Sequence, residues 1–284
     1  MGEPEKDIVT VKILPQEAPD GISLGMSSII GTRSSQEDTV FCYGREKEAL
    51  GLVCDGMGGL EGGELASKAA AESFANAWFS CGGITDVPRF LEEEAIRADE
   101  KVFCQENEEG ERIRAGTTIV AAIIREDELF WLSVGDSRIY IIRGEEILSV
   151  CREHNYRLTL DWKLEQGELT PEEYAAEEYR AEALISYLGM GNVSLMDVNR
   201  QPFLLEDGDI VLLTSDGLYR SLSQEEILAL VKEAKEDMQK AADMLTAAAL
   251  GDKKSGQDNT SVVLMRYGGK QEKDRRMQDG FKEM

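Results

Sequence analysis

The order of the expected elements predicts an α+β fold, built from antiparallel sheets and packed layers of helices. Segments with strand character follow one another in hairpin-like order, and the helical segments come in separate pairs instead of alternating with strands. Regular alternation would indicate a parallel sheet, so this order favours an antiparallel layered domain. Apolar residues make up 42% of the 284 residues, which is enough for a sizeable core.

The elements follow from apolar runs with turn signals between them, and from two Ala-rich helical stretches. An irregular, proline-interrupted extension is expected at residues 1–20. The expected strands are 21–30, 38–43, 49–54, 117–124, 129–134, 139–143, 147–150, 194–199, 209–214 and 260–266. The expected helices are 64–79, 90–108, 224–232 and about 237–250. We therefore expect one domain at 21–267 and a charged tail at 268–284.

Residues 155–183 interrupt the strand pattern and indicate an inserted flap. Apolar residues are sparse there among many acids. Thr170 and Glu173 have the spacing of a capping box, and Pro171 suits the first position of a helix. A short helix should therefore begin after Thr170.

Charge and cysteine usage limit the function classes. The formal net charge of −24 repels phosphate backbones and anionic lipid, so neither nucleic acid nor a membrane surface is an expected partner. No apolar run approaches the length of a membrane helix. Five widely spaced cysteines without a CxxC pair suit reduced thiols in the cytoplasm. We interpret the acidic stretch 92–111 as a solvated helix face.

Acidic residues recur where apolar strands begin or end. Strands run into Asp55-Gly56, Asp136-Ser137 and Asp216-Gly217, and Asp258 precedes the last strand. A further cluster is Arg33-Ser-Ser-Gln-Glu37-Asp38. Each Asp-Gly alone is more simply a turn, and Asp136 alone is more simply a hairpin cap. Their joint occurrence, together with one arginine, indicates a site.

Carboxylates at strand ends can gather at one rim of a sheet, where they repel one another unless cations lie between them. The single histidine, His154, excludes any site that needs two imidazoles. The expected cation is therefore a hard, oxygen-binding ion such as Mg²⁺, Mn²⁺ or Ca²⁺. A glycine after Asp55 would let the backbone carbonyl approach such an ion.

The ordered motifs carry a family resemblance. They are Arg33 to Asp38, Asp55-Gly-Met-Gly-Gly59 with Gly63-Glu-Leu-Ala-Ser67, Ala115-Gly-Thr-Thr118, Val134-Gly-Asp-Ser-Arg138, Leu188-Gly189, Ser215-Asp-Gly-Leu218 and Asp258-Asn-Thr260. This string, over about residues 21–267, closely resembles the metal-dependent PP2C (PPM) protein Ser/Thr phosphatases of bacteria. The resemblance implies a four-layer α-β-β-α sandwich with two Mg²⁺ or Mn²⁺ ions at one edge.

The resemblance also implies residue roles. Asp55 would bridge the two ions, and the Gly56 carbonyl would bind one of them. Asp216 and Asp258 would bind the other, Glu37 and Asp38 would hold metal-bound waters, and Arg33 would bind the substrate phosphate. Asp136, with Asp216, matches a third metal position of bacterial relatives. The implied partners are phosphorylated proteins, such as an autophosphorylated Ser/Thr kinase or its targets, and a monomer is expected.

Two departures and one alternative accompany this interpretation. Met57 stands where many eukaryotic relatives have a proton-donating His, so we expect a metal-bound water to be the donor. We interpret His154 as a structural hydrogen-bonding residue at the base of the flap, in preference to a catalytic one. The alternative is a non-catalytic phosphoprotein-binding or signalling module of the same fold. The net charge further predicts a preference for substrates with basic residues beside the phosphosite.

Overall fold

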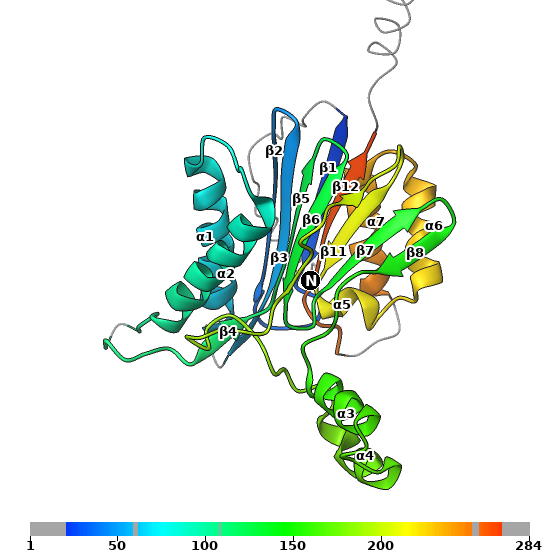
Figure 1. Ribbon diagram of the computed structural model, residues 1–284. Coiled ribbons are helices and arrows are strands. Elements are labelled where there is room, and N and C mark those ends of the chain that lie inside the picture. The colour runs from blue at the N-terminus through cyan, green and yellow to red at the C-terminus, as the bar shows by residue number, and fades with distance from the viewer. Residues whose placement is uncertain (1–20, 59–61, 108, 252–255, 269–284) are drawn as a thin grey trace, which may run out of the picture.

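The computed structural model describes residues 21–58, 62–107, 109–251 and 256–268. The expected extension at 1–20 and the tail beyond Gly268 lie outside the described residues. Two antiparallel sheets form the centre of the molecule (Figure 1). The first has the order β1 (Ile22–Ile29), β12 (Thr260–Tyr267), β11 (Ile210–Thr214), β7 (Arg138–Arg143) and β8 (Glu146–Ser149). The second has the order β10 (Phe203–Leu204), β6 (Glu128–Val134), β5 (Ile119–Arg125), β3 (Glu48–Gly58) and β2 (Asp38–Arg45), with β4 (Ala115–Thr117) on β3 and β9 (Asp197–Val198) on β6.

A pair of helices covers the outer face of each sheet, so the predicted α+β sandwich of four layers is confirmed (Figure 1). Helices α1 (Gly62–Ser80) and α2 (Val87–Phe103) pack on the second sheet. Helices α6 (Gln224–Ala234) and α7 (Met238–Leu250) pack on the first. A third apolar cluster lies between the two sheets.

Strand β3 shows why the sequence folds into these layers. Leu50 and Leu52 point to the helix side, whereas Ala49 and Val53 point to the other sheet. A strand that is buried on both faces reads as a continuous apolar run, which is what residues 49–54 present. The same run carries Asp55 to the end of the strand.

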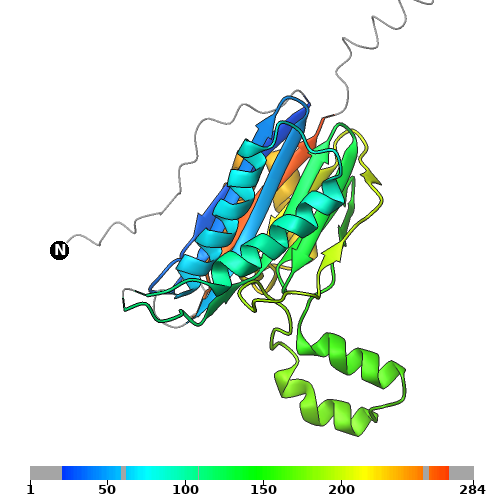
Figure 2. The ribbon, with the colours of Figure 1, turned by 60° about the vertical axis from the view of Figure 1, so that its left-hand side comes forward.

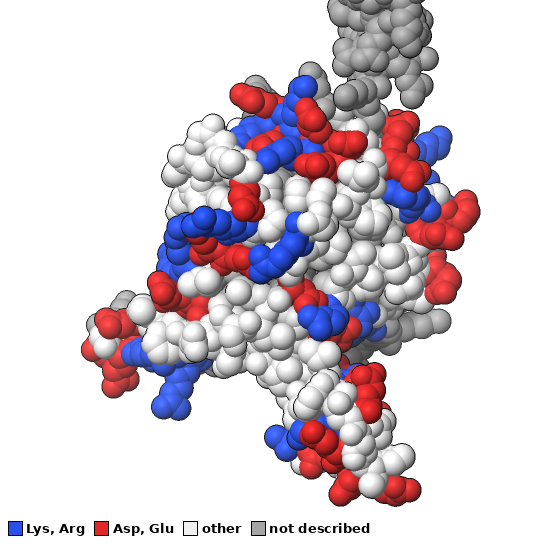
Figure 3. All heavy atoms as spheres, in the orientation of Figure 1, with Lys and Arg blue, Asp and Glu red and all other residues white. Residues whose placement is uncertain are grey.

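The segment at 155–183 projects from the sandwich (Figures 1 and 2). It consists of α3 (Tyr156–Glu165), α4 (Pro171–Glu177) and a 3-10 turn at Glu178–Arg180. The predicted helix start is confirmed, because the Glu173 backbone N–H donates to Thr170 Oγ1 and the Thr170 backbone N–H donates to Glu173. Leu160 is the only buried side chain among these elements as described. Asp and Glu side chains gather on this projection (Figure 3).

His154 lies at the base of the projection, fully buried. Its Nδ1 accepts a hydrogen bond from the Gly135 backbone N–H at 3.2 Å, and the His154 backbone N–H donates to the Gly135 carbonyl at 2.8 Å. The predicted structural role of His154 is therefore confirmed.

Several expected boundaries were wrong. The strand expected at 117–124 is split at Thr118, whose backbone N–H donates to the Asp55 carbonyl (2.9 Å) instead of continuing the ladder. The strand expected at 194–199 shrinks to Asp197–Val198. The second helix begins at Val87, where Asp86 accepts from the Arg89 N–H, and it ends at Phe103.

The acidic face expected on α2 was wrong in part, because Glu94 and Asp99 are buried. Asp99 accepts three backbone N–H groups, from Gly189 at 2.7 Å, Gly191 at 3.1 Å and Val193 at 3.0 Å. A carboxylate that satisfies three donors is stable inside a protein. Asp99 thus fixes the loop at 189–193 against α2.

The cysteines are all free thiols. No helix of the described residues is both long and apolar enough to cross a membrane.

Candidate metal and phosphate site

The acidic residues singled out in the sequence lie at one rim of the two sheets. Asp38 opens β2 and pairs with Asp55 of β3 in the strand register. Asp258 lies just before β12, and Asp216 just after β11. Asp136 lies in the turn between β6 and β7. Because strands are rigid, these ends hold their carboxylates in fixed relative positions.

A cavity of about 340 Å³ opens at this rim. The residues that line it are Arg33, Ser34, Ser35, Glu37, Asp55, Gly56, Met57, Gly58, Asp258 and Asn259. It therefore brings together Arg33, Glu37, Asp55, Gly56 and Asp258 of the predicted set. Asp38, Asp136 and Asp216 do not line it, and they lie around Asp55 instead.

Arg33 is anchored at the mouth of this cavity. Its Nη2 donates to Asp258 Oδ2 at 2.6 Å, while 59% of its side chain remains exposed. The pairing follows from the topology, since Ile29 at the end of β1 pairs with Thr260 at the start of β12. The guanidinium therefore faces both a carboxylate and solvent.

Asn259 organises the loop that carries Glu37. Its Oδ1 accepts from the Glu37 backbone N–H at 2.8 Å, and its Nδ2 donates to the carbonyls of Ile30 and Ser35. Ser35 Oγ donates to Glu37 Oε1 at 3.1 Å. These bonds fix Glu37 in the wall of the cavity that Asp55 also lines.

Asp38 is buried and only half satisfied. Its Oδ2 accepts from Ser215 Oγ at 2.8 Å, but its Oδ1 has no hydrogen-bond partner among the described residues. Burial is the main cause that raises its pKa to about 7, and Asp216 and Asp258 raise it further. A buried oxygen without a partner is costly, so this carboxylate is suited to a ligand or an ordered water.

Asp55 is repelled by the negative charges of four other carboxylates. Burial raises its pKa well above the ordinary range, and the charges of Asp38, Asp216, Asp136 and Asp258 raise it further. Burial and Asp216 likewise raise the pKa of Asp136 to about 6. These carboxylates are therefore close enough to act on one another, as the argument from strand ends predicted.

Arg220 lies beside Asp136 and Asp216. Its Nε is 3.1 Å from Asp216 Oδ2, and its Nη2 is 3.8 Å from Asp136 Oδ2. Burial raises the pKa of Asp216, whereas Arg220 opposes that rise. Tyr219 adds a hydrogen bond from its hydroxyl to the Asp136 carbonyl at 3.0 Å.

Two glycines let the loops approach closely. A Cβ at Gly56 would collide with the Gly63 carbonyl, and it would lie only 2.5 Å from the backbone carbonyl oxygen of Glu37. A Cβ at Gly217 would collide with the Asn259 carbonyl. The glycines after Asp55 and Asp216 are therefore required by backbone packing, a reason beyond the carbonyl access that the sequence suggested.

The donor set fits hard divalent ions. Every candidate ligand atom is an oxygen, and the repulsion between the carboxylates favours a bound cation. Asp38 Oδ1 has no hydrogen-bond partner in the part of the chain that the structure describes. The carboxylates do not close on one point: no three His, Cys, Asp or Glu side chains of the described residues form a ready ligand group. Arg33 and Arg220 pair with some of them instead.

Comparisons with known proteins find similarity to protein phosphatases. A family profile for protein phosphatase 2C matches residues 22–160. The protein phosphatase PhpP of Streptococcus pneumoniae is 29% identical over 236 residues, which cover 82% of this chain and 92% of PhpP. The serine/threonine phosphatase stp of Listeria innocua is 27% identical over 224 residues, which cover 78% of this chain and 85% of stp.

A solved structure extends the similarity to the fold. The catalytic domain of the serine/threonine protein phosphatase PstP, in complex with two manganese ions, superposes with a TM-score of 0.68 at 27% identity and covers 86% of this chain and 97% of that one. Residues 22–160 of this chain thus match the protein phosphatase 2C family, and the sandwich shares the fold of a solved Ser/Thr phosphatase.

The sequence alone assigned no role to four residues that support the site, although three of them stand within the motifs quoted above. They are Thr118, Ser215, Arg220 and Asn259. Arg220 had a detectable signal, because it follows Asp216 by four residues and so lies on the same face of a helical turn. The other three act through bonds to distant segments, which spacing alone does not reveal.

Proposed function

We propose that this phosphatase hydrolyses phosphoserine and phosphothreonine on proteins, using two divalent ions, Mn²⁺ or Mg²⁺, held by the rim carboxylates. The observation that carries the proposal is the meeting of Glu37, Asp55 and Asp258 with Arg33 in one cavity. The named relatives support the substrate class, and the manganese complex of PstP supports the metal.

Each predicted residue has a role in this proposal. Asp55 would be shared by both ions, the Gly56 carbonyl would serve one, and Asp216 and Asp258 would serve the other. Glu37 and Asp38 would act through ordered waters, which suits the unpartnered Asp38 Oδ1. Asp136 with Asp216 would hold a third ion. When bound, the ions neutralise charge and acidify water, which supplies the nucleophile.

Arg33 would orient the phosphate. Its planar guanidinium can give two parallel N–H groups to two phosphate oxygens, which a lysine ammonium cannot match. Its side chain lines the cavity and is largely exposed, and its bond to Asp258 would fix the orientation of the guanidinium. Catalysis then rests on positioning and charge neutralisation, without a covalent phosphoenzyme.

Met57 lines the cavity but cannot give a proton to the departing alkoxide. We propose that ordered water in the site supplies that proton. We also propose that the chain acts as a monomer in the cytoplasm, on an autophosphorylated Ser/Thr kinase or on that kinase's targets.

The test is hydrolysis of p-nitrophenyl phosphate and of a phosphothreonine peptide with and without Mn²⁺. We expect Mn²⁺-dependent turnover that falls by at least about a hundredfold in Asp55→Asn and in Asp216→Asn. Asp207→Asn is the matched control, since Asp207-Gly208 is an exposed Asp-Gly turn away from the rim.

Undiminished turnover in Asp55→Asn would refute the assignment. Wild-type protein that binds phosphopeptide but never hydrolyses it, with Mn²⁺ present, would favour the alternative of a binding module.

A further inference from the structure

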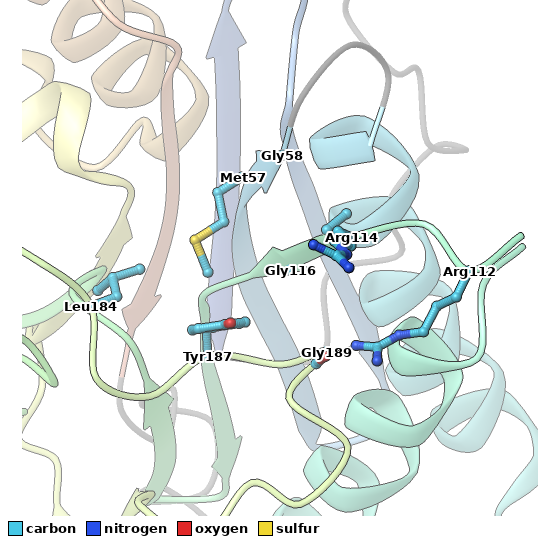
Figure 4. Close-up of a pocket in the computed structure, with 9 residues that line it drawn as sticks. Met57, Gly58, Arg112, Arg114, Gly116, Leu184, Tyr187 and Gly189 are labelled. Carbon is cyan, nitrogen blue, oxygen red and sulfur yellow. Dashed lines mark hydrogen bonds between the residues drawn. The ribbon is translucent and has the colours of Figure 1, made fainter. Parts of the chain in front are cut away.

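A second cavity adjoins the metal and phosphate site. It has a volume of about 690 Å³ and shares Met57 and Gly58 with the first cavity. Its other lining residues are Arg112, Arg114, Ala115, Gly116, Leu184, Tyr187 and Gly189 (Figure 4). None of the described lining residues is Asp or Glu, although the chain as a whole carries a net charge of −24.

Arg112 and Arg114 differ from the other arginines. Within residues 21–58, 62–107, 109–251 and 256–268, every other arginine forms an ion pair with Asp or Glu. Arg112 and Arg114 form none with the residues described there. In so acidic a protein, two guanidiniums in one cavity that have no acidic partner among the described residues are expected to attract an anion from outside the chain.

Arg112 is held in place by contacts that do not involve an acidic side chain of the described residues. Its guanidinium lies 3.5 Å from the centre of the Phe103 ring, and its Nη2 donates to the Gly189 carbonyl at 3.4 Å. Gly189 is itself fixed by its N–H bond to buried Asp99. A guanidinium has five N–H donors, so most of them remain available to a ligand.

The rest of the cavity suits a peptide. Leu184 and Tyr187 give it an apolar side opposite Arg112 and Arg114 (Figure 4). The Tyr187 ring lies against Gly116, where a Cβ would collide with the ring. Apolar surface with a few charged groups is typical of a site that takes a side chain and its backbone.

We propose that this cavity binds an anionic group, a carboxylate or a second phosphate, on the chain that flanks the phosphoresidue being hydrolysed. The inference rests on the proposed phosphatase function and names its substrate class. This expected preference for acidic flanks is opposite to the preference for basic flanks that the net charge predicted. The positive charges of Arg112 and Arg114 lie in the cavity itself, whereas most of the negative charges of the chain are farther away and are screened by salt.

The experiment compares kcat/KM, with Mn²⁺, on phosphothreonine peptides that are identical except for flanks of Ala, Asp, Lys or a second phosphothreonine. We expect about a three- to tenfold advantage of the Asp-flanked over the Ala-flanked peptide, and a larger one for the second phosphate. Arg112→Gln/Arg114→Gln should bring both ratios close to one. Arg112→Lys/Arg114→Lys should retain part of the preference.

Arg89→Gln is the matched control, because it removes one exposed positive charge on α2 from an ion pair with Glu93. It should retain the wild-type ratios. Equal rates on the Ala, Asp and second-phosphothreonine peptides, a preference for Lys flanks, or ratios that the double Gln variant leaves unchanged would overturn the inference. An effect of the second phosphate alone would identify phosphate, and not carboxylate, as the ligand.

Peptide affinity, measured by fluorescence anisotropy, gives the same comparison without turnover. If wild-type protein hydrolyses none of the peptides, the proposed function fails. The affinity ratios of wild type and double variant then still decide whether the cavity binds an anionic flank.

Discussion

At the scale of one residue, the Asp55 carboxylate is placed where a metal ion would need it but where its charge lowers the stability of the metal-free fold. Burial and four neighbouring carboxylates raise its pKa, so a negative charge there costs folding free energy in the absence of cations. Asp55→Asn keeps the shape and removes the charge. We expect its thermal midpoint in EDTA to rise by about 3 °C over wild type, while activity is lost.

The control for this prediction is Asp207→Asn, whose exposed turn position should leave the midpoint within about 1 °C. Differential scanning fluorimetry in EDTA measures both variants. A midpoint of Asp55→Asn below that of wild type would show that the carboxylate is stabilised by contacts instead of being strained by repulsion.

Asp99 connects helix α2 to the loop that forms part of the cavity wall beside the site. It lies on α2, yet its three hydrogen bonds fix the loop at 189–193, and Gly189 is part of the cavity wall beside the site. Asp99→Ala would leave three backbone N–H groups without their acceptor. We expect a loss of at least about 3 kcal/mol in the free energy of unfolding.

Urea denaturation measures this loss. Glu100→Ala, a solvent-exposed neighbour on the same helix, serves as the control and should change stability by less than about 0.5 kcal/mol. If Asp99→Ala were as stable as that control, the three hydrogen bonds would not hold the loop.

Strand β9 gives a pH-dependent prediction. Partial burial alone would raise the pKa of Asp197, but His154 and hydrogen bonds from Arg152 outweigh it and hold the pKa below its usual range. A folded pKa below the unfolded value of about 3.9 adds stability above that pH, and the added stability is lost as the pH falls through the folded pKa.

Asp197→Asn should therefore be less stable than wild type near about pH 7, and the difference should shrink below about pH 4. Urea midpoints of the two proteins at both pH values measure it. A difference that grows as the pH falls would contradict the assignment.

The elements themselves were predictable to different degrees. Residues 49–54 and 260–266 were recognisable as strands because each contains a continuous apolar run that is buried on both faces. The two-residue strands β9 and β10 carry too few residues for a periodic pattern, and the 4-residue helix α5 begins at Asp216 itself. Thr118 broke an apolar run because a bond to Asp55 replaced its ladder bond.

At the scale of the whole molecule, the string of acidic motifs predicted which carboxylates lie at the rim. It did not predict which of them line the cavity and which lie outside it. Five members of the predicted set line one cavity, while Asp136 and Asp216 lie beside Arg220. That division depends on how β12 pairs with β11 and, across more than two hundred residues of chain, with β1. Single-sequence patterns do not reveal such a register. Asp99 escaped prediction for the same reason, since its partners are distant backbone groups.

The central claim is that carboxylates from distant segments hold two divalent ions at one rim. Crystals grown with Mn²⁺ and measured at the manganese absorption edge test it most directly. The account predicts two anomalous peaks that share the Asp55 carboxylate, one of them also within bonding distance of Asp216 and Asp258. Peaks that lie elsewhere, or none at this rim with Mn²⁺ in excess, would contradict it.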